Sequence, residues 1–229
     1  MKTVIIHGQS HKGSTYHVAR QLAEEVGGDI KEFFLPRDFG EFCIGCTKCF
    51  MEGEEKCPHY EKLEPITRVI DEADLIVLES PVYVYHATGA MKAFLDHYAY
   101  RWMIHRPHEA MFRKQGVCVA TAAGAGVKST IMDMKHSLFF WGVARRYGLG
   151  FAVAAVSWDQ IVPRKKAVID KKIAKLAAKI KRRNGKIKPS FRTRFLFWGM
   201  HLVQRKGFFP RDKQYWDEKG WTENKRPWK

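Results

Sequence analysis

The segment Thr3–Thr15 has the sequence TVIIHGQSHKGST. Its beginning, Thr3–His7, is a short apolar run rich in β-branched residues, which is typical of a strand buried on both faces of a sheet. We expect Ser14-Thr15 to cap a helix that runs to about Val26 and that Gly27-Gly28 ends. A buried strand followed by a short loop and a helix predicts the first part of a βαβ unit.

The same alternation recurs along the chain. Further strands are expected at Ile30–Leu35, Ala73–Glu79, Gly116–Thr121 and Phe151–Ser157. Helices are expected at Glu61–Glu72, Thr88–Tyr100, Val127–Arg146 and Arg164–Arg183. This alternation implies right-handed crossovers and a parallel sheet. Because there are five strands and no sixth, we predict a doubly wound, flavodoxin-like α/β fold with strand order 2-1-3-4-5 rather than the longer dinucleotide-binding fold.

Length and composition favour one core with an appendage. The chain has 229 residues, of which 45% are hydrophobic. We expect a flavodoxin-like domain over residues 1–185 and a basic, aromatic-rich extension over 186–229. No apolar stretch approaches the roughly 20 residues that span a bilayer, and the N-terminal run is too short for a signal peptide. The five cysteines do not resemble a secreted disulfide framework, so we expect a cytoplasmic protein.

The charge is distributed very unevenly. Residues 1–162 contain 18 Lys and Arg against 19 Asp and Glu, whereas residues 163–229 contain 22 against 5. The net charge of +16 therefore belongs to the C-terminal third, which needs an explanation of its own.

The loop between the first strand and the first helix has the chemistry of a phosphate site. Ser10, Ser14 and Thr15 supply hydroxyl donors, and Lys12 or His11 can add charge. The helix N-terminus presents free N–H groups. The loop is neither a P-loop nor a G-x-G-x-x-G motif, so a phosphomonoester is expected rather than a dinucleotide. The alternative is an ordinary capped helix after a turn.

Two later loops complete a pattern. Pro81 forces an extended path that lets the N–H groups of Val82 and Tyr83 point at a ligand, and Tyr83 and Tyr85 can stack on a planar ring. The loop Thr121-Ala122-Ala123-Gly124-Ala125-Gly126 follows the fourth strand, and its glycines permit close backbone approach. The three loops follow strands one, three and four, whose carboxyl ends lie at one edge of the predicted sheet.

These motifs resemble those of NAD(P)H-dependent FMN reductases and flavodoxin-like quinone reductases. The similarity lies in the S-x-x-x-S-T spacing, in Ser80-Pro81-Val82-Tyr83 followed by Met91–Asp96, and in the Gly-rich loop, where Ala122-Ala123 replace part of the usual glycine pair. It implies FMN as cofactor, NAD(P)H as electron donor and a homodimer or homotetramer. No catalytic side chain is needed, because the flavin provides the hydride chemistry. The implied FMN contacts are Ser10, Lys12, Ser14, Thr15, Pro81, Val82, Tyr83, Thr121, Ala122, Ala123 and Gly124.

Four of the five cysteines form a second motif. Cys43, Cys46, Cys49 and Cys57-Pro58 have the spacing C-x2-C-x2-C-x7-C-P, close to that of bacterial ferredoxins. The motif also resembles that of iron–sulfur flavoproteins, which implies a [4Fe–4S] cluster. Zinc and unligated, reactive thiols are the alternatives, although structural zinc usually takes two separated pairs. Cys118 lies within a predicted strand, and we expect it to pack in the core.

The basic C-terminal third allows three interpretations. After the Lys-rich helix, Ser190–Arg205 places Phe191, Phe195, Trp198 and Leu202 on one face of a helix. The segment can fold over the protein's own body or a dimer partner, lie peripherally on an anionic membrane, or bind nucleic acid. We favour the first and consider nucleic acid the weakest, because no motif accompanies the basic run.

The sequence as a whole favours an NAD(P)H-dependent FMN oxidoreductase that reduces a small-molecule acceptor such as a quinone, nitro compound or azo compound. The alternative is an electron carrier of the flavodoxin or iron–sulfur flavoprotein type. Free flavodoxins tend to be small and acidic, and this chain is longer and basic, which favours the enzyme.

Overall fold

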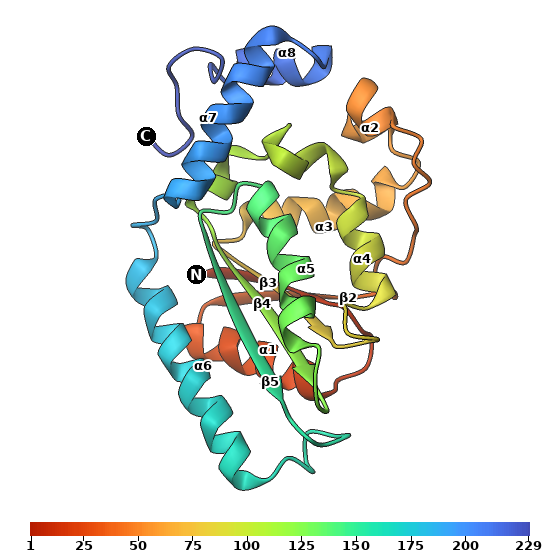
Figure 1. The fold of residues 1–229 in the computed structure, drawn as a ribbon, viewed down its shortest axis with the longest axis vertical. Helices are drawn as coiled ribbons and strands as arrows, with labels where there is room; N and C mark the ends of the chain where they lie inside the picture. Colours follow the sequence, from red (N-terminus) through yellow and green to blue (C-terminus); the bar gives the residue numbers. More distant parts are fainter.

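A five-stranded parallel sheet forms the centre of the computed structural model, which describes residues 1–229 (Figure 1). The order β2-β1-β3-β4-β5 confirms the predicted fold class. The three central strands are almost continuously buried, as expected of strands covered on both faces. The strands are β1 (Lys2–His7), β2 (Asp29–Phe34), β3 (Leu75–Pro81), β4 (Gln115–Ala122) and β5 (Arg145–Ala152).

Helices cover both faces of the sheet. On one face, α1 (Ser14–Val26) and α6 (Pro163–Arg183) pack side by side and contribute to an 18-residue core cluster. On the other face, a 21-residue cluster takes its helical members mainly from α3 (Tyr60–Glu72), α4 (Gly89–Asp96) and α5 (Val127–Phe140). Cys118 of β4 is fully buried in this second cluster, and burial raises the pKa of its thiol to about 12.

The fifth strand differs from the prediction. It spans Arg145–Ala152 rather than Phe151–Ser157, and the preceding helix ends at Phe140 instead of Arg146. β5 is an edge strand of mixed burial and contains Gly148 and Gly150, so the local pattern lacks a buried apolar run. The structure gives a reason for the glycines: a side chain at either position would collide with α5, which crosses the strand closely there.

Several short elements also lie outside the predicted set. The helix expected at Thr88–Tyr100 stops at Asp96, and a 3-10 segment η2 (Ala99–Ile104) with a kink at Met103 follows it. The other additions are α2 (Lys48–Met51) and two 3-10 turns, η1 (Glu54–Lys56) and η3 (Glu109–Arg113). Such short segments have no room for a helical period in the sequence.

The C-terminal extension folds onto the body. The predicted helix is present as α7 (Phe191–Lys206) with Ser190 as its N-cap, and α8 (Pro210–Glu218) follows it. Apolar residues of the extension form a third core cluster with residues of η2 and η3, namely Ile104, Phe112, Phe197, Met200, Trp216 and Trp221. In Figure 1 both helices lie at the end of the sheet where β5 begins. None of the helices is both long and apolar enough to cross a bilayer.

Candidate functional site

A cavity of about 190 Å³ opens where the three predicted loops meet. The loops follow the carboxyl ends of β1, β3 and β4, which are neighbours in the sheet. Residues more than 100 positions apart in the sequence therefore line one cavity. Eight of the eleven predicted cofactor-binding residues line it: Ser14, Thr15, Pro81, Val82, Tyr83, Thr121, Ala122 and Ala123.

The remaining three predicted residues do not line this cavity. The hydroxyl of Ser10 donates to the carbonyl of Leu35 at 3.1 Å, which turns it toward the end of β2. The ammonium group of Lys12 lies over the ring of Tyr16, 5.2 Å from the ring centroid. Gly124 lies in the loop after β4, and a Cβ atom there would meet nothing within 4 Å.

The N-terminus of α1 is open toward the cavity. Its N-cap is Gly13, and no side chain accepts from the N–H groups of its first turn. These groups have no partner within a helix either, so they are available to an anion. Beside them, the buried hydroxyls of Thr15 and Thr121 share a hydrogen bond of 2.6 Å. This bond joins the α1 end of the site to the loop after β4.

The backbone of the loop after β3 is not free, contrary to the prediction. The N–H of Val82 donates to the carbonyl of Thr121, and that of Tyr83 donates to the carbonyl of His86, both at 3.0 Å. The first bond extends the pairing of β3 with β4 by one step, and the second closes a tight turn. What Tyr83 presents to the cavity is its side chain, whose hydroxyl accepts from Nε2 of Gln9 at 2.8 Å.

The turn after Tyr83 is strained. Val84 and Tyr85 have φ angles of +48° and +66°, which are unfavourable for non-glycine residues and above all for a β-branched one. Both side chains are exposed. The turn is held by the start of α5, because the hydroxyl of Ser129 in α5 donates to the carbonyl of Tyr85, and Gly126, the N-cap of α5, packs against Tyr85. An exposed, strained turn at the rim of a cavity is typical of a ligand-binding segment.

A buried polar chain under the cavity was not predicted. Nδ1 of His7 lies 2.8 Å from Oε1 of Glu79, and Nε2 lies 3.0 Å from Oε1 of Glu32, which pairs with Arg20. Glu79 lines the cavity, and its Oε2 is buried without a hydrogen-bond partner. Burial raises the pKa of Glu79, and its hydrogen bond with His7 opposes this. The only sequence signal was a carboxyl group at the end of the apolar run Leu-Ile-Val-Leu-Glu.

The four clustered cysteines meet at a second site. Their side chains line one small cavity of about 20 Å³ together with His59 and His97, and none of them forms a disulfide. The pKa of Cys49 is raised by burial first and then by the nearby thiols of Cys57, Cys43 and Cys46. Four thiols around one space are a donor set suited to an iron–sulfur cluster or zinc.

The histidines beside the cysteines form a competing donor set. Nδ1 of His59 lies 2.9 Å from Nε2 of His97, and the donor atoms of Cys57, His59 and His97 lie within 4.8 Å of one another. Burial lowers the pKa of His97, which keeps its ring neutral and able to bind a metal. This set offers one thiol and two imidazoles, a combination that zinc accepts.

The C-terminal extension supports the cysteine loop. The guanidinium of Arg106 donates to the carbonyl of Cys49 and forms a buried ion pair with Asp212 of α8. Oδ2 of Asp212 also accepts from Nδ1 of His105 at 2.6 Å. The loop that carries the cysteines is therefore held by Arg106, 57 positions further along the chain, which Asp212 of the extension holds in turn.

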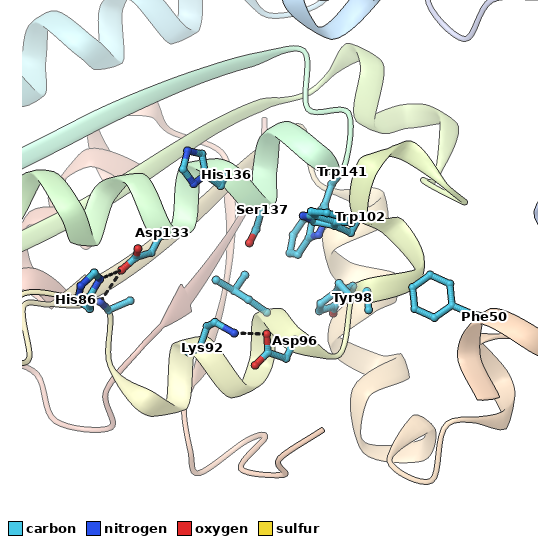
Figure 2. Close-up of a pocket in the computed structure, with 13 residues that line it drawn as sticks. Phe50, His86, Lys92, Asp96, Tyr98, Trp102, Asp133, His136, Ser137 and Trp141 are labelled. Carbon is cyan, nitrogen blue, oxygen red and sulfur yellow. Dashed lines mark hydrogen bonds and ion pairs between the residues drawn. The ribbon is translucent and has the colours of Figure 1, made fainter. Parts of the chain in front are cut away.

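A larger cavity of about 590 Å³ lies between α4 and α5 (Figure 2). It extends from His86, in the turn after β3, to Phe50 beside Cys49. None of the predicted cofactor-binding residues lines it, and its one lysine, Lys92, is paired with Asp96. Although it is larger, we assign the cofactor to the first cavity, because only that one has an open helix N-terminus and converging hydroxyls.

Comparison with known proteins agrees with this geometry. The fold and the site define a flavoprotein oxidoreductase of the flavodoxin-like class. The family model described as NADPH-dependent FMN reductase matches residues 1–156, which include all three loops and the cysteine motif. The chain belongs to this family, as its motifs indicated.

Individual relatives are more distant. The chain is 27% identical over 159 residues to an iron–sulfur flavoprotein of Archaeoglobus fulgidus, an alignment that covers 67% of this chain and 70% of the relative. The solved structure of a flavone reductase superimposes on this chain with a TM-score of 0.57 at 14% sequence identity. The alignment covers 79% of this chain and 63% of the flavone reductase. An FMN-dependent NADH-azoreductase from Bacillus anthracis, solved with FMN, has a TM-score of 0.57 at 12% identity over 77% of this chain and 100% of the azoreductase. The two structural likenesses support the fold alone.

Proposed function

We propose that this protein is an NAD(P)H-dependent FMN oxidoreductase that passes electrons to a quinone, a nitro or azo compound, or another small acceptor. The observation that supports this most directly is the convergence of three distant loops on a cavity at the open N-terminus of α1. The family gives the cofactor class, and the azoreductase named above, an FMN-dependent enzyme that uses NADH, has the same fold.

The residues of the cavity have separate tasks in this proposal. The first-turn N–H groups of α1 and the hydroxyl of Ser14 bind the FMN phosphate. Tyr83, held by Gln9, and the loop at Thr121–Ala123 border the ring. Bound FMN supplies the two-electron chemistry. The strained turn at Val84-Tyr85 is exposed at the rim, where a donor or an acceptor arrives.

Reduction of a quinone, nitro or azo acceptor takes up protons together with electrons, and the polar chain below the cavity supplies one of these protons from Glu79. His7 has a ring nitrogen facing each of two carboxyl groups, and each of these contacts needs one hydrogen. The group therefore holds two protons, either as imidazolium between two carboxylates or as neutral imidazole beside one protonated carboxyl. The burial of Glu79 favours a proton on Glu79, whose Oε2 has no other partner. Glu32, which faces Nε2 of His7 and is partly exposed, connects the chain to solvent for replacement of the proton.

A steady-state assay tests the proposal. We expect the FMN-loaded protein to oxidise NADH or NADPH and to reduce at least one member of a panel containing a quinone, a nitroaromatic and an azo dye. Turnover needs both the nicotinamide and the acceptor. Absence of turnover with every donor and acceptor in a flavin-replete sample would refute the oxidoreductase assignment but leave the cofactor assignment standing.

The cysteine site supports a second candidate function. We propose that Cys43, Cys46, Cys49 and Cys57 bind a [4Fe–4S] cluster, which makes the protein an electron carrier of the iron–sulfur flavoprotein type. The supporting observation is that all four thiols border one space and are close enough to raise the pKa of Cys49. A reducing compartment keeps such thiols available to a metal, and the cytoplasmic location remains a proposal from the sequence.

The two candidates make different predictions for the purified protein. Iron and sulfide near four per chain, with an EPR signal after reduction, support the carrier. Zinc near one per chain, or metal-free thiols that react with Ellman's reagent, refutes it. Assembly into a homodimer or homotetramer remains a proposal from the family resemblance, and light scattering tests it.

A further inference from the structure

Helix α7 carries an apolar stripe on its exposed side, in addition to the residues that it packs into the core. Its outward-facing residues Phe191, Phe195, Trp198 and Leu202 are 80%, 61%, 53% and 42% exposed. They follow one another at intervals of four, three and four residues, so they form one continuous stripe. The opposite side packs on the body through Phe197 and Met200, together with the buried polar residues Thr193, His201 and Gln204. The core contacts of α7 therefore leave the exposed stripe uncovered, whereas a surface helix in water normally has a polar outer face.

The stripe continues beyond its own side chains. A hollow of about 490 Å³ lies beside it and is lined almost entirely by apolar groups, among them Met103, Phe139 and Leu196. Phe208, just past the end of α7, is 67% exposed. A contiguous apolar surface of this kind marks an interaction site rather than scattered exposed residues.

Positive charges surround the stripe, and they are not neutralised within the chain. Sixteen Lys and Arg lie between Arg164 and Lys206 with a single acidic residue, Asp170. None of the sixteen forms an ion pair, although ion pairs are frequent elsewhere in the molecule. Exposed cations lie at both ends of the stripe: Lys186, Lys188, Arg192 and Arg194 at one end, and Arg205 and Lys206 at the other.

We propose that this face of α7 docks on an anionic lipid surface. Aromatic side chains prefer the boundary between head groups and acyl chains, and unpaired Lys and Arg are attracted to anionic head groups. A second copy of the chain is a poorer occupant, because two surfaces with the same excess of positive charge repel each other. A nucleic acid would attract the charge but leave an aliphatic residue such as Leu202 unexplained.

The position of α7 defines the orientation on the surface. The N–H of Ser190 donates to the carbonyl of Ala144 at 3.3 Å, just before β5 begins. α7 therefore starts near the amino ends of the strands (Figure 1). The cofactor cavity is lined by loops that follow the carboxyl ends of β1, β3 and β4. Docking through the stripe leaves that cavity open to water.

Vesicle flotation of the full chain tests the proposal. The wild type and a triple variant, Phe191→Ser/Phe195→Ser/Trp198→Ser, are mixed with vesicles of phosphatidylcholine alone or with about 30% phosphatidylserine. Val162→Ser/Val168→Ser is the matched control, because it removes exposed apolar side chains from the basic helix α6 and its N-cap without touching the stripe. Arg192→Glu/Arg194→Glu tests the charge separately.

We expect the wild type and the α6 control to float with the phosphatidylserine vesicles only, and to be released by about 0.5 M salt, where screening is strong. The triple variant and the charge variant should bind at least about tenfold more weakly, with unchanged circular dichroism and thermal midpoint. A wild type that stays in solution refutes the proposal. A triple variant that floats as well as the wild type also refutes it. A wild type that is dimeric in solution while the triple variant is monomeric would assign the stripe to a second copy of the chain. Duplex DNA that the wild type binds in preference to the vesicles, and that the triple variant no longer binds, would assign it to nucleic acid.

Discussion

Nδ1 of His7 lies 2.8 Å from Oε1 of Glu79 at the carboxyl ends of two adjacent strands, and both side chains are fully buried. Glu79 is the only carboxyl group among the residues that line the cofactor cavity, and His7 lies behind it. A carboxyl group in such a position is costly unless it is protonated or paired. It therefore provides a way to examine the site that does not depend on the acceptor.

Glu79→Gln is expected to retain the cofactor and to change the pH dependence of turnover. In the wild type, burial raises the pKa of Glu79, so the protonated form persists above its ordinary value of 4.5 and turnover falls as pH rises through the raised pKa. The amide cannot transfer a proton, so this limb disappears and turnover drops by about 10²-fold. Rate profiles against pH for the wild type and the variant measure both effects.

The matched control is Glu72→Gln, an exposed carboxyl group at the end of α3. Its profile should superimpose on that of the wild type. If turnover by Glu79→Gln depends on pH in the same way as turnover by the wild type, the proton-donor role is contradicted, even if the rates themselves are lower.

Lys114 predicts a different pH dependence, in stability. Burial lowers its pKa to about 8, and its ammonium nitrogen donates to the carbonyls of Asp71 and Ala73. Between about pH 8 and 10.5 the unfolded chain binds a proton that the native chain does not, so the free energy of unfolding rises with pH over this interval. This gain in stability is complete above about pH 10.5 and has been lost once the pH has fallen through about 8. Urea titrations at several pH values should show the rise, and Lys114→Met should remove it.

The fold was more predictable than the site. Continuous burial of β1, β3 and β4 leaves a clear signal in the sequence, and Gly- and Ser-rich loops mark their ends. β5 was misplaced because Gly148 and Gly150 are required by a helix that crosses them, a contact the local sequence does not record. The N–H groups of Val82 and Tyr83 were misassigned for the same reason, since their acceptors come from a neighbouring strand and a turn.

Cys46→Ser should abolish any cluster at the second site. Cys46 is exposed and borders the same cavity as the other three thiols, so its loss removes a ligand without disturbing packing. We expect the iron content and the visible absorption of the cluster to disappear while flavin absorption remains. The control Cys118→Ala removes a thiol from the core and should leave the iron content unchanged. Equal iron in Cys46→Ser and wild type would contradict the assignment.

Asp212→Asn should destabilise the protein by weakening the contact between α8 and the body. Asp212 and Arg106 are both buried, so the substitution leaves a guanidinium charge without its partner, at a cost of about 3–5 kcal/mol. Asp217→Asn on the same helix is exposed, and we expect its midpoint of urea unfolding to match the wild type. If the two variants unfold at the same urea concentration, the buried ion pair between Arg106 and Asp212 does not contribute the predicted stability.

The central claim is that the cavity at the N-terminus of α1 binds FMN through its phosphate. Calorimetric titration of the cofactor-free protein with FMN and with riboflavin measures this directly. We predict one FMN per chain, bound at least about 10²-fold more tightly than riboflavin, because the open first turn and its hydroxyls act on the phosphate alone. Equal affinity for the two flavins, or no binding of either, would contradict the account.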